Sequence, residues 1–238
     1  MFDDGITLHD KHSYRDFGAW LKSKTIGIPS TIKITETIPY MQGSYDFTEL
    51  YGEQTYDDRE LEYEFDLHAT TDNPKKELRA KAIAFTNWLK SASKSELIDD
   101  DYPGFYFLAE AVDNIDIDDT EIYIATIKVK FTAYGLMIKN HLEGQTQWDT
   151  FGFLTDTFQQ TKFEVNGARE IFLYNVGIRS ITPQIICDSN FVLNIDDYQY
   201  KITSGITKDY RLSLKKGVNR IIVTGTGNIE FKFRFEVL

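Results

Sequence analysis

The chain has 238 residues, 42% of them hydrophobic and 14% aromatic, which suits one large or two small domains and excludes a disordered protein. The formal net charge of −11 argues against a surface that neutralises nucleic-acid phosphates, and the single cysteine, Cys187, excludes an internal disulfide framework. No apolar run reaches the roughly 18 residues that a membrane span needs. Acidic residues stand where a signal peptide would carry basic ones, so we expect a soluble protein that stays on the cytoplasmic side.

Residues 1–37 predict short strands and loops, in which Ile32, Ile34 and Ile38 alternate imperfectly with polar neighbours. The segment "RELEYEFDL", residues 59–67, follows a strict period of two. Its apolar face holds Leu61, Tyr63, Phe65 and Leu67, and its polar face holds Glu60, Glu62, Glu64 and Asp66. This alternation predicts a half-buried strand with an acidic face toward solvent.

One helix is predicted, from about Pro74 to Ser91. Asn73 can cap its first turn, and proline suits the first helical position because it lacks the N–H that would be unsatisfied there. An apolar stripe at spacings of three and four consists of Leu78, Ala82, Phe85 and Leu89. We expect this stripe to pack against a sheet while the lysines of the helix face water.

Three strands separated by turns are predicted after the helix, as far as Gly135. Pro103 and Gly104 mark one turn, and the acidic cluster at 113–119 marks another. From about Met137 to Thr157 the apolar periodicity lapses. We therefore place the seam between two domains in this segment.

Beyond the seam the pattern predicts strands and turns only. The pair Asn166-Gly167 between two apolar stretches is typical of a two-residue β-hairpin turn. Strands follow at "PQIICD", "FVLNI", "YQYKIT" and "YRLSL". The final strand places on one face Ile229, Phe231, Phe233, Phe235 and Val237. Many short strands at this spacing predict an antiparallel β-sandwich.

Candidate catalytic and metal-binding residues form no recognisable pattern. His9 and His12 lie three apart beside acids but have no helix or cysteine with them, so we interpret them as mobile surface histidines. A calcium-loop alignment that starts at Asp116 fails at its glycine and closing glutamate positions. Cys187 lies within a predicted strand, which favours a packed thiol over a nucleophile. We therefore predict that the protein is not an enzyme and holds no metal or cofactor.

The order of the elements resembles the distal tail protein (Dit) family of long-tailed, non-contractile phages and prophages of Gram-positive hosts. The stretches that carry the resemblance are "SYRDFGAWL" (13–21), "IPYMQGSYDFTELYGEQTYDDRELEYEFDL" (38–67), "PKKELRAKAIAFTNWL" (74–89), "YPGFYFLAEAV" (102–112) and "IATIKVKFTAYG" (124–135). A family motif, Y-x-x-R before a strand, is present at Tyr56 and Arg59. The family's glycine-containing turn before the tyrosine-rich loop is replaced by Ser44-Tyr45-Asp46. The C-terminal stretch 210–238 is similar to the galectin-like second domain of the same proteins.

The resemblance implies a mainly β fold. Residues 1–138 would form a β-sandwich or split-barrel domain with one α-helix, which is tail-tube-like and forms rings. Residues 139–157 would be a linker, and residues 158–238 a galectin-like antiparallel β-sandwich. The protein would be a virion component at the tail tip, made in the host cytoplasm, in which a homo-hexameric ring joins the tail tube to the tail fibre, hub or receptor-binding protein. DNA would pass through the ring without specific nucleic-acid binding, and there would be no membrane contact.

The resemblance places the ring contacts in the N-terminal domain. The tyrosine-rich loop suits such contacts, since tyrosines have few rotamers to immobilise at an interface and loops between strands lie on surfaces. The assembly residues are then Tyr40, Tyr45, Tyr51, Tyr56 and Arg59. In the alternative interpretation the tyrosines cover the domain's own sheet.

Two other functions remain open at this stage. One is a carbohydrate-binding module of a phage adhesion device, although residues from 158 onward contain neither tryptophan nor histidine, and Trp148 lies before them. The other is a hydrolase with a dispersed site. The absence of a tryptophan platform favours docking or scaffolding for the second domain.

Overall fold

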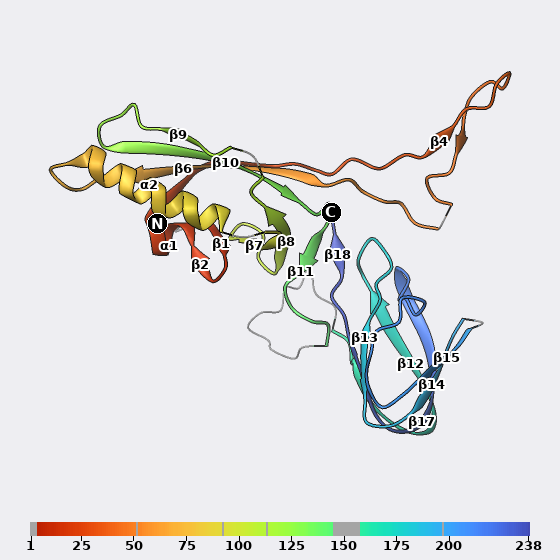
Figure 1. Ribbon diagram of the computed structural model, residues 1–238. Coiled ribbons are helices and arrows are strands. Elements are labelled where there is room, and N and C mark those ends of the chain that lie inside the picture. Colours follow the sequence, from red (N-terminus) through yellow and green to blue (C-terminus); the bar gives the residue numbers. More distant parts are fainter. Residues whose placement is uncertain (1–3, 51, 92, 113, 145–157, 197) are drawn as a thin grey trace. The chain divides into compact units, whose positions relative to one another are not determined.

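The computed structural model describes residues 4–50, 52–91, 93–112, 114–144, 158–196 and 198–238. Over these residues the chain is mainly β, with antiparallel sheets, as the sequence predicts. Two compact units are present, Met1–Ile138 together with Leu238, and Lys139–Val237 (Figure 1). We call them the N-terminal unit and the C-terminal unit.

The N-terminal unit is built on one antiparallel sheet. Its helices are α1 (Ser13–Phe17) and α2 (Pro74–Lys90). Its strands are β1 (Ile6–Leu8), β2 (Lys11–His12), β3 (Ala19–Ile26), β4 (Thr35–Glu36), β5 (Tyr45–Asp46), β6 (Arg59–His68), β7 (Ser95–Asp99), β8 (Phe105–Glu110), β9 (Asp116–Asp118), β10 (Ile124–Ala133) and β11 (Met137–Lys139), within which the unit ends. The sheet order is β2-β1-β7-β8-β10-β6-β3.

Strand β6 confirms the predicted alternation. Its four apolar side chains are at most 1% exposed, whereas the acids between them lie on the other face. Strand β10 pairs with β6 along its whole length and places lysines beside these acids. The Lys128 Nζ lies 2.6 Å from the Glu64 carboxylate, and the Lys130 Nζ lies 2.5 Å from that of Glu62. The solvent face of the two strands is therefore a ladder of opposite charges, which specifies their register.

Helix α2 also forms where the sequence predicts it. The Asn73 side chain accepts a hydrogen bond from the Lys76 N–H, and Pro74 is the first helical residue. The buried residues of the helix are the predicted Leu78, Ala82, Phe85 and Leu89, together with Trp88. The Phe85 ring meets the Phe65 ring of β6 edge to face at 5.1 Å, so the stripe packs on the apolar face of the sheet.

The first turn of α2 contains Glu77, whose contacts require the ionised carboxylate. Glu77 accepts hydrogen bonds from the backbone N–H groups of Thr70 and Thr71, each at 2.9 Å, and pairs with Lys81 at 2.8 Å. The Lys81 ammonium and these N–H groups lower the pKa of Glu77 to about 2, from 4.5. A lowered pKa contributes stability that is complete above the unfolded value and disappears as the pH falls through the folded value.

We therefore expect Glu77→Gln to lower the thermal midpoint at pH 7, and the gap to wild type to close between about pH 4.5 and about pH 2. Calorimetry of both proteins over this range measures the gap. Glu96→Gln, at an exposed position of β7, is the control and should give a small, pH-independent difference. A gap for Glu77→Gln that stays constant down to pH 2 would contradict the assigned role.

A second, short helix departs from the prediction of one helix. Helix α1 begins after His12, whose Nδ1 accepts hydrogen bonds from the N–H groups of Tyr14 (3.1 Å) and Arg15 (3.2 Å). It ends at Gly18, whose φ of 65° is a left-handed conformation that glycine adopts without strain. Five residues are too few to give the periodic signal by which helices are recognised in a sequence.

His12 also corrects the interpretation of both histidines as surface residues. Its side chain is buried. Both ring nitrogens have partners there: Nε2 lies 2.9 Å from the Asp100 carboxylate, and Nδ1 caps α1. His9 is exposed, as predicted, in the turn before β2. The error arose because Asp100 is 88 residues away in the sequence, so the pattern around His12 did not include its partner.

Asp99 forms a polar network in the core with Lys24 and Tyr63, and the exposed Asp101 joins it from the surface through Lys24. The Asp99 carboxylate has no exposed surface and lies 2.6 Å from the Lys24 Nζ and 2.8 Å from the Tyr63 hydroxyl. The Asp101 carboxylate also lies 2.6 Å from Lys24. Burial, together with the Asp99 charge, raises the pKa of Tyr63 far above its usual value, so its hydroxyl remains a donor. The network ties β3, β6 and β7 together.

The acidic cluster at 113–119, predicted as a turn, contains a strand. Residues Asp116–Asp118 form β9, which pairs with β10 so that Asp116 lies opposite Lys128. The opposite charge across the ladder makes an acidic strand tolerable at this edge. Asp113 lies outside the described residues.

The C-terminal unit contains strands and turns only, within its described residues. Its strands are β12 (Lys162–Asn175), β13 (Gln184–Cys187), β14 (Phe191–Ile195), β15 (Tyr198–Ile202), β16 (Gly205–Thr207), β17 (Gly217–Lys232) and β18 (Glu236–Val237). The order is β15-β14-β17-β13-β16, with β12 paired along β17. Strand β14 pairs with the first half of β17 and β13 with the second half. One core fills the unit, and it includes the buried thiol of Cys187, as predicted.

The predicted hairpin at Asn166-Gly167 is wrong, because β12 continues through it. Gly167 (φ 90°) lies opposite Gly225 (φ 153°) in the ladder with β17. Five consecutive residues of β12 around this pair, 166–170, are exposed, while the residues on either side alternate in and out of the core. The glycine pair therefore marks a bend in a long two-stranded ribbon, and the conformational freedom that suggested a turn serves the bend.

Two further predictions for the C-terminal unit are corrected or refined. The stretch "YRLSL" is not a strand; Leu214 forms only an isolated bridge with Ile181, although it is fully buried. In the final segment the apolar face is buried as predicted through Phe235, whereas Val237 is half-buried.

Of the segment 139–157, predicted as a linker, residues 145–157 lie outside the described residues. Lys139 and Glu143 form a buried ion pair at 2.7 Å in the C-terminal unit.

Candidate assembly surface

A long two-stranded arm, residues 28–57, leaves the sheet of the N-terminal unit between β3 and β6 (Figure 1). Its two sides are held by sparse backbone hydrogen bonds, from Asp57 N–H to Ser30 O (2.9 Å) and from Phe47 N–H to Ile34 O (2.8 Å). The short strands β4 and β5 pair near its outer end. The arm is thus a ribbon with few hydrogen bonds between its two sides, and it encloses no core.

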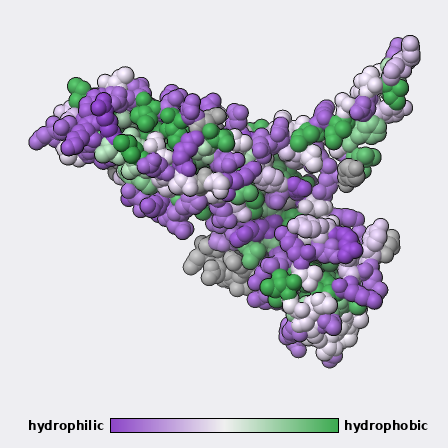
Figure 2. All heavy atoms as spheres, in the orientation of Figure 1, coloured by the Kyte–Doolittle hydropathy of each residue, from purple (hydrophilic) through white to green (hydrophobic). Residues whose placement is uncertain are grey.

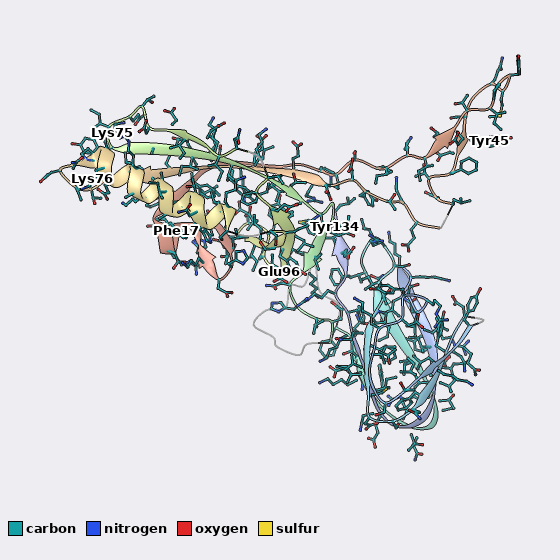
Figure 3. The ribbon with its side chains drawn as sticks, viewed as in Figure 1. Phe17, Tyr45, Lys75, Lys76, Glu96 and Tyr134 are labelled. Carbon is teal, nitrogen blue, oxygen red and sulfur yellow. The ribbon has the colours of Figure 1, made fainter. Side chains whose placement is uncertain are left out.

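The arm exposes large apolar side chains. They are Ile28, Ile32, Ile34, Ile38, Tyr40, Tyr45, Phe47 and Leu50, with exposed fractions from 37% to 108%. Figure 2 shows hydrophobic residues along the arm, and Figure 3 shows the Tyr45 side chain standing on it, away from the sheet. A two-stranded ribbon is at best marginally stable alone, and a concentration of exposed apolar side chains marks an interaction surface. We call this set the apolar arm surface.

The base of the arm is packed tightly against the sheet. Gly135 follows β10, and a Cβ atom at this position would lie 2.3 Å from the Asp57 carbonyl oxygen and 3.3 Å from the Tyr56 Cβ. Only glycine permits this approach. The Arg59 Nε donates a 2.7 Å hydrogen bond to the Gly135 carbonyl, and its guanidinium lies over the Phe107 ring at 5.4 Å. The arm therefore begins from a fixed base.

The predicted assembly residues fall at three different levels of the arm. Tyr40 lies at the outer turn with φ 68° and Tyr45 on β5, and both are exposed. Tyr56 is half-buried at the base, where it bridges to Thr31. Arg59 is 4% exposed, and burial lowers its pKa, so it fixes the base and does not present a charge to solvent. Tyr51 lies outside the described residues.

Sequence reasoning missed the isoleucines of the arm and Gly135. The imperfect alternation at Ile32, Ile34 and Ile38 predicts short strands and loops but not their exposure, and these side chains are 40–52% exposed. The available signal was the breakdown of alternation itself, since a strand of a packed sheet keeps one face apolar and the other polar.

The described residues contain no cluster of metal-ligating side chains. No group of three or more His, Cys, Asp or Glu side chains among them is placed to hold a metal ion. Within the same residues, none of the helices has the length and apolar character to cross a membrane.

Comparison with known proteins places this unit in a family. Residues 11–133, which include the arm, match the family model of the phage tail protein RIFT-related domain. The whole fold is similar to the crystal structure of the SPP1 Dit protein (gp 19.1), described there as a paradigm of the hub adsorption apparatus in Gram-positive infecting phages. The TM-score is 0.66 at 13% sequence identity, and the match covers 98% of this chain and 99% of that chain. At this identity the likeness concerns the fold. No curated protein sequence matches the chain.

Proposed function

The chain belongs to the family of the phage tail protein RIFT-related domain, and from this premise we propose that it forms a hexameric ring at the distal end of a phage tail. Membership makes it a structural tail component and therefore part of the virion. In our proposal the ring joins the tail tube to the tail fibre, hub or receptor-binding protein. DNA passes through it, and the net charge of −11 suits such a conduit because an acidic wall does not hold phosphates.

The apolar arm surface is the observation that carries this proposal. A closed ring needs a heterologous contact, in which one surface of each copy meets a different surface of the next. An arm on a fixed base, with exposed Tyr40 and Leu50, can supply one side of such a contact without distorting the sheet. Residues 1–138 then form the ring, residues 139–157 link the parts, and the galectin-like unit from 158 onward docks other tail proteins.

Sedimentation velocity over a range of concentrations tests the ring. We expect hexamers, or two stacked hexamers, at high concentration and monomers on dilution. Replacing Tyr40 and Leu50 together by Ser should shift the transition to higher concentration by at least about tenfold, because apolar area is lost from the contact. The control replaces Val112 and Tyr123 by Ser, which are 54% and 58% exposed outside the arm.

Two outcomes would contradict the proposal. One is a wild-type chain that stays monomeric at every concentration and also ignores added tail-tube and hub proteins. The other is an equal loss of association in the arm variant and the control, since this would mean that the arm has no special part in the contact.

A further inference from the structure

The C-terminal unit contains an open groove between the edge strand β15 and the loop that follows β16. The groove has a volume of about 740 Å³, which lies within the range of roughly 300–1,000 Å³ that ligand sites occupy. The Tyr200 hydroxyl donates a 2.8 Å hydrogen bond to the Arg211 carbonyl and so fixes the loop to the strand. Because Tyr200 also packs against the core, the two walls of the groove are held at a set distance.

Aromatic side chains stand exposed at the groove. Tyr198 lines it and is 70% exposed, on the same side of β15 as Tyr200. Tyr210, in the facing loop, is 81% exposed, and the Lys208 Nζ lies over its ring at 5.9 Å. Such rings are flat apolar surfaces with a polar edge, which suits a ligand that is apolar on one face and hydroxylated around its rim.

A paired arginine and aspartate, Arg211 and Asp209, also line the groove. Arg211 reaches Asp209 with two nitrogens, Nε at 3.1 Å and Nη2 at 2.7 Å from the two carboxylate oxygens. These hydrogen bonds lower the pKa of Asp209, so the carboxylate stays ionised at neutral pH. The pair holds fixed donors and acceptors side by side. The Asp209 Oδ1 also accepts from the Arg211 backbone N–H at 3.0 Å, so the lone pair that remains for a ligand is on Oδ2.

The segment that supplies the groove is basic in an otherwise acidic chain. Residues 198–220 contain one acid, Asp209, and six basic residues, although the whole chain has a net charge of −11. The basic residues are Lys201, Lys208, Arg211, Lys215, Lys216 and Arg220. Lys215 and Arg220 are paired with Asp196 and Glu170. Among the described residues neither Lys201 nor Lys208 has a carboxylate partner, so both are available to an anion.

We propose that this groove binds a glycan chain that carries negative charges, with Tyr198 as the stacking surface, Arg211 and Asp209 as hydroxyl partners, and Lys201 and Lys208 as anion contacts. A sugar ring offers the face for stacking and the neighbouring hydroxyls for a fixed donor–acceptor pair. An acidic peptide would use the lysines but would gain little from the exposed ring. The site needs neither tryptophan nor histidine, and it does not rest on ring assembly.

Binding of three soluble polymers to the full chain tests the proposal by calorimetric titration. Alginate carries sugar rings and carboxylates, polyglutamate carries carboxylates without rings, and dextran carries rings without charge. We expect alginate to bind with a dissociation constant of about 1 mM or tighter, and the other two to bind at least about tenfold more weakly. Amide shifts on adding alginate oligomers should concentrate in residues 198–212.

Variants distinguish binding at this groove from non-specific electrostatic attraction of alginate to the protein. Tyr198→Ala and Arg211→Ala should each weaken alginate binding by about tenfold or more. The matched controls Tyr123→Ala and Arg79→Ala, at exposed positions of the N-terminal unit, should leave it unchanged. The Tyr40/Leu50 arm variant should bind as wild type does, which distinguishes this inference from the proposed ring. No saturable binding of alginate, or equal binding of polyglutamate that survives Tyr198→Ala, would overturn the proposal.

Discussion

Replacing Asp99 by Ala is expected to lower the free energy of unfolding of the N-terminal unit by about 3–5 kcal/mol, the range for removing one partner of a buried ion pair. The Asp99 carboxylate has no exposed surface and accepts from both Lys24 and Tyr63. Without it the Tyr63 hydroxyl keeps no described partner in the core, and the Lys24 ammonium keeps only Asp101. An unsatisfied buried donor costs its full desolvation energy.

Guanidinium titration followed by tryptophan fluorescence measures this loss, since Trp20 and Trp88 belong to the N-terminal unit. Asp99→Asn should lose less than Asp99→Ala, because an amide oxygen can still accept from Tyr63. Asp101→Ala is the matched control: its carboxylate is 56% exposed and lies at the same 2.6 Å from Lys24. We expect it to cost at most about 1 kcal/mol. Equal losses for the two alanine variants would show that burial of Asp99 is unimportant.

The second large effect is expected in the core of the C-terminal unit. Phe231 is fully buried, with its ring edge to face with Phe163 at 6.3 Å. Phe231→Ala should destabilise this unit by about 3–5 kcal/mol, through lost apolar burial and the cavity left behind. Phe172→Ala is the control, because that ring is 48% exposed.

Differential scanning calorimetry resolves the effect if the two units unfold in separate transitions. The transition that shifts in Phe231→Ala should be unaffected by Asp99→Ala, and the reverse should hold for the other transition. A single transition that both variants lower by the same amount would mean that the units unfold together. A Phe172→Ala loss as large as that of Phe231→Ala would contradict the packing described for this core.

The sequence predicted those elements whose signals lie within them. Strand β6 repeats its alternation over ten residues, and α2 combines a cap, a first-turn proline and an apolar stripe. Such patterns arise because one face of the strand or helix is buried, so the signal lies within the element and does not depend on knowing its partners.

The failures involve residues whose partners are distant in the sequence. His12 depends on Asp100, and the glycine of the predicted hairpin at Gly167 depends on Gly225 across the ladder. His12 was therefore predicted on the surface although it is buried, and Gly167 was predicted in a hairpin turn although it lies within a strand. The positive φ of Gly167 serves a bend and not a turn.

The candidate assembly site was predicted from only part of what the structure exposes in this segment. Tyrosines marked the loop, but its protrusion from the sheet and its exposed isoleucines could not be read from composition. Arg59 was assigned to the same surface through a motif, and the structure places it in the buried base. In the C-terminal unit, the basic run at 198–220 was a visible signal of the groove that the net charge of the whole chain obscured.

The arm has a consequence for the ionic strength at which copies can meet. Each copy has a formal net charge of −11, so two copies repel one another before any apolar contact forms. The Debye length falls from about 30 Å in 0.01 M salt to about 8 Å in 0.15 M salt, which weakens the repulsion while leaving the hydrophobic contact largely intact. In the proposed ring, association through the apolar arm surface should therefore be favoured by added salt, the opposite of association through complementary charges. We expect copies of the chain to stay apart in dilute buffer and to associate at about 0.15 M salt.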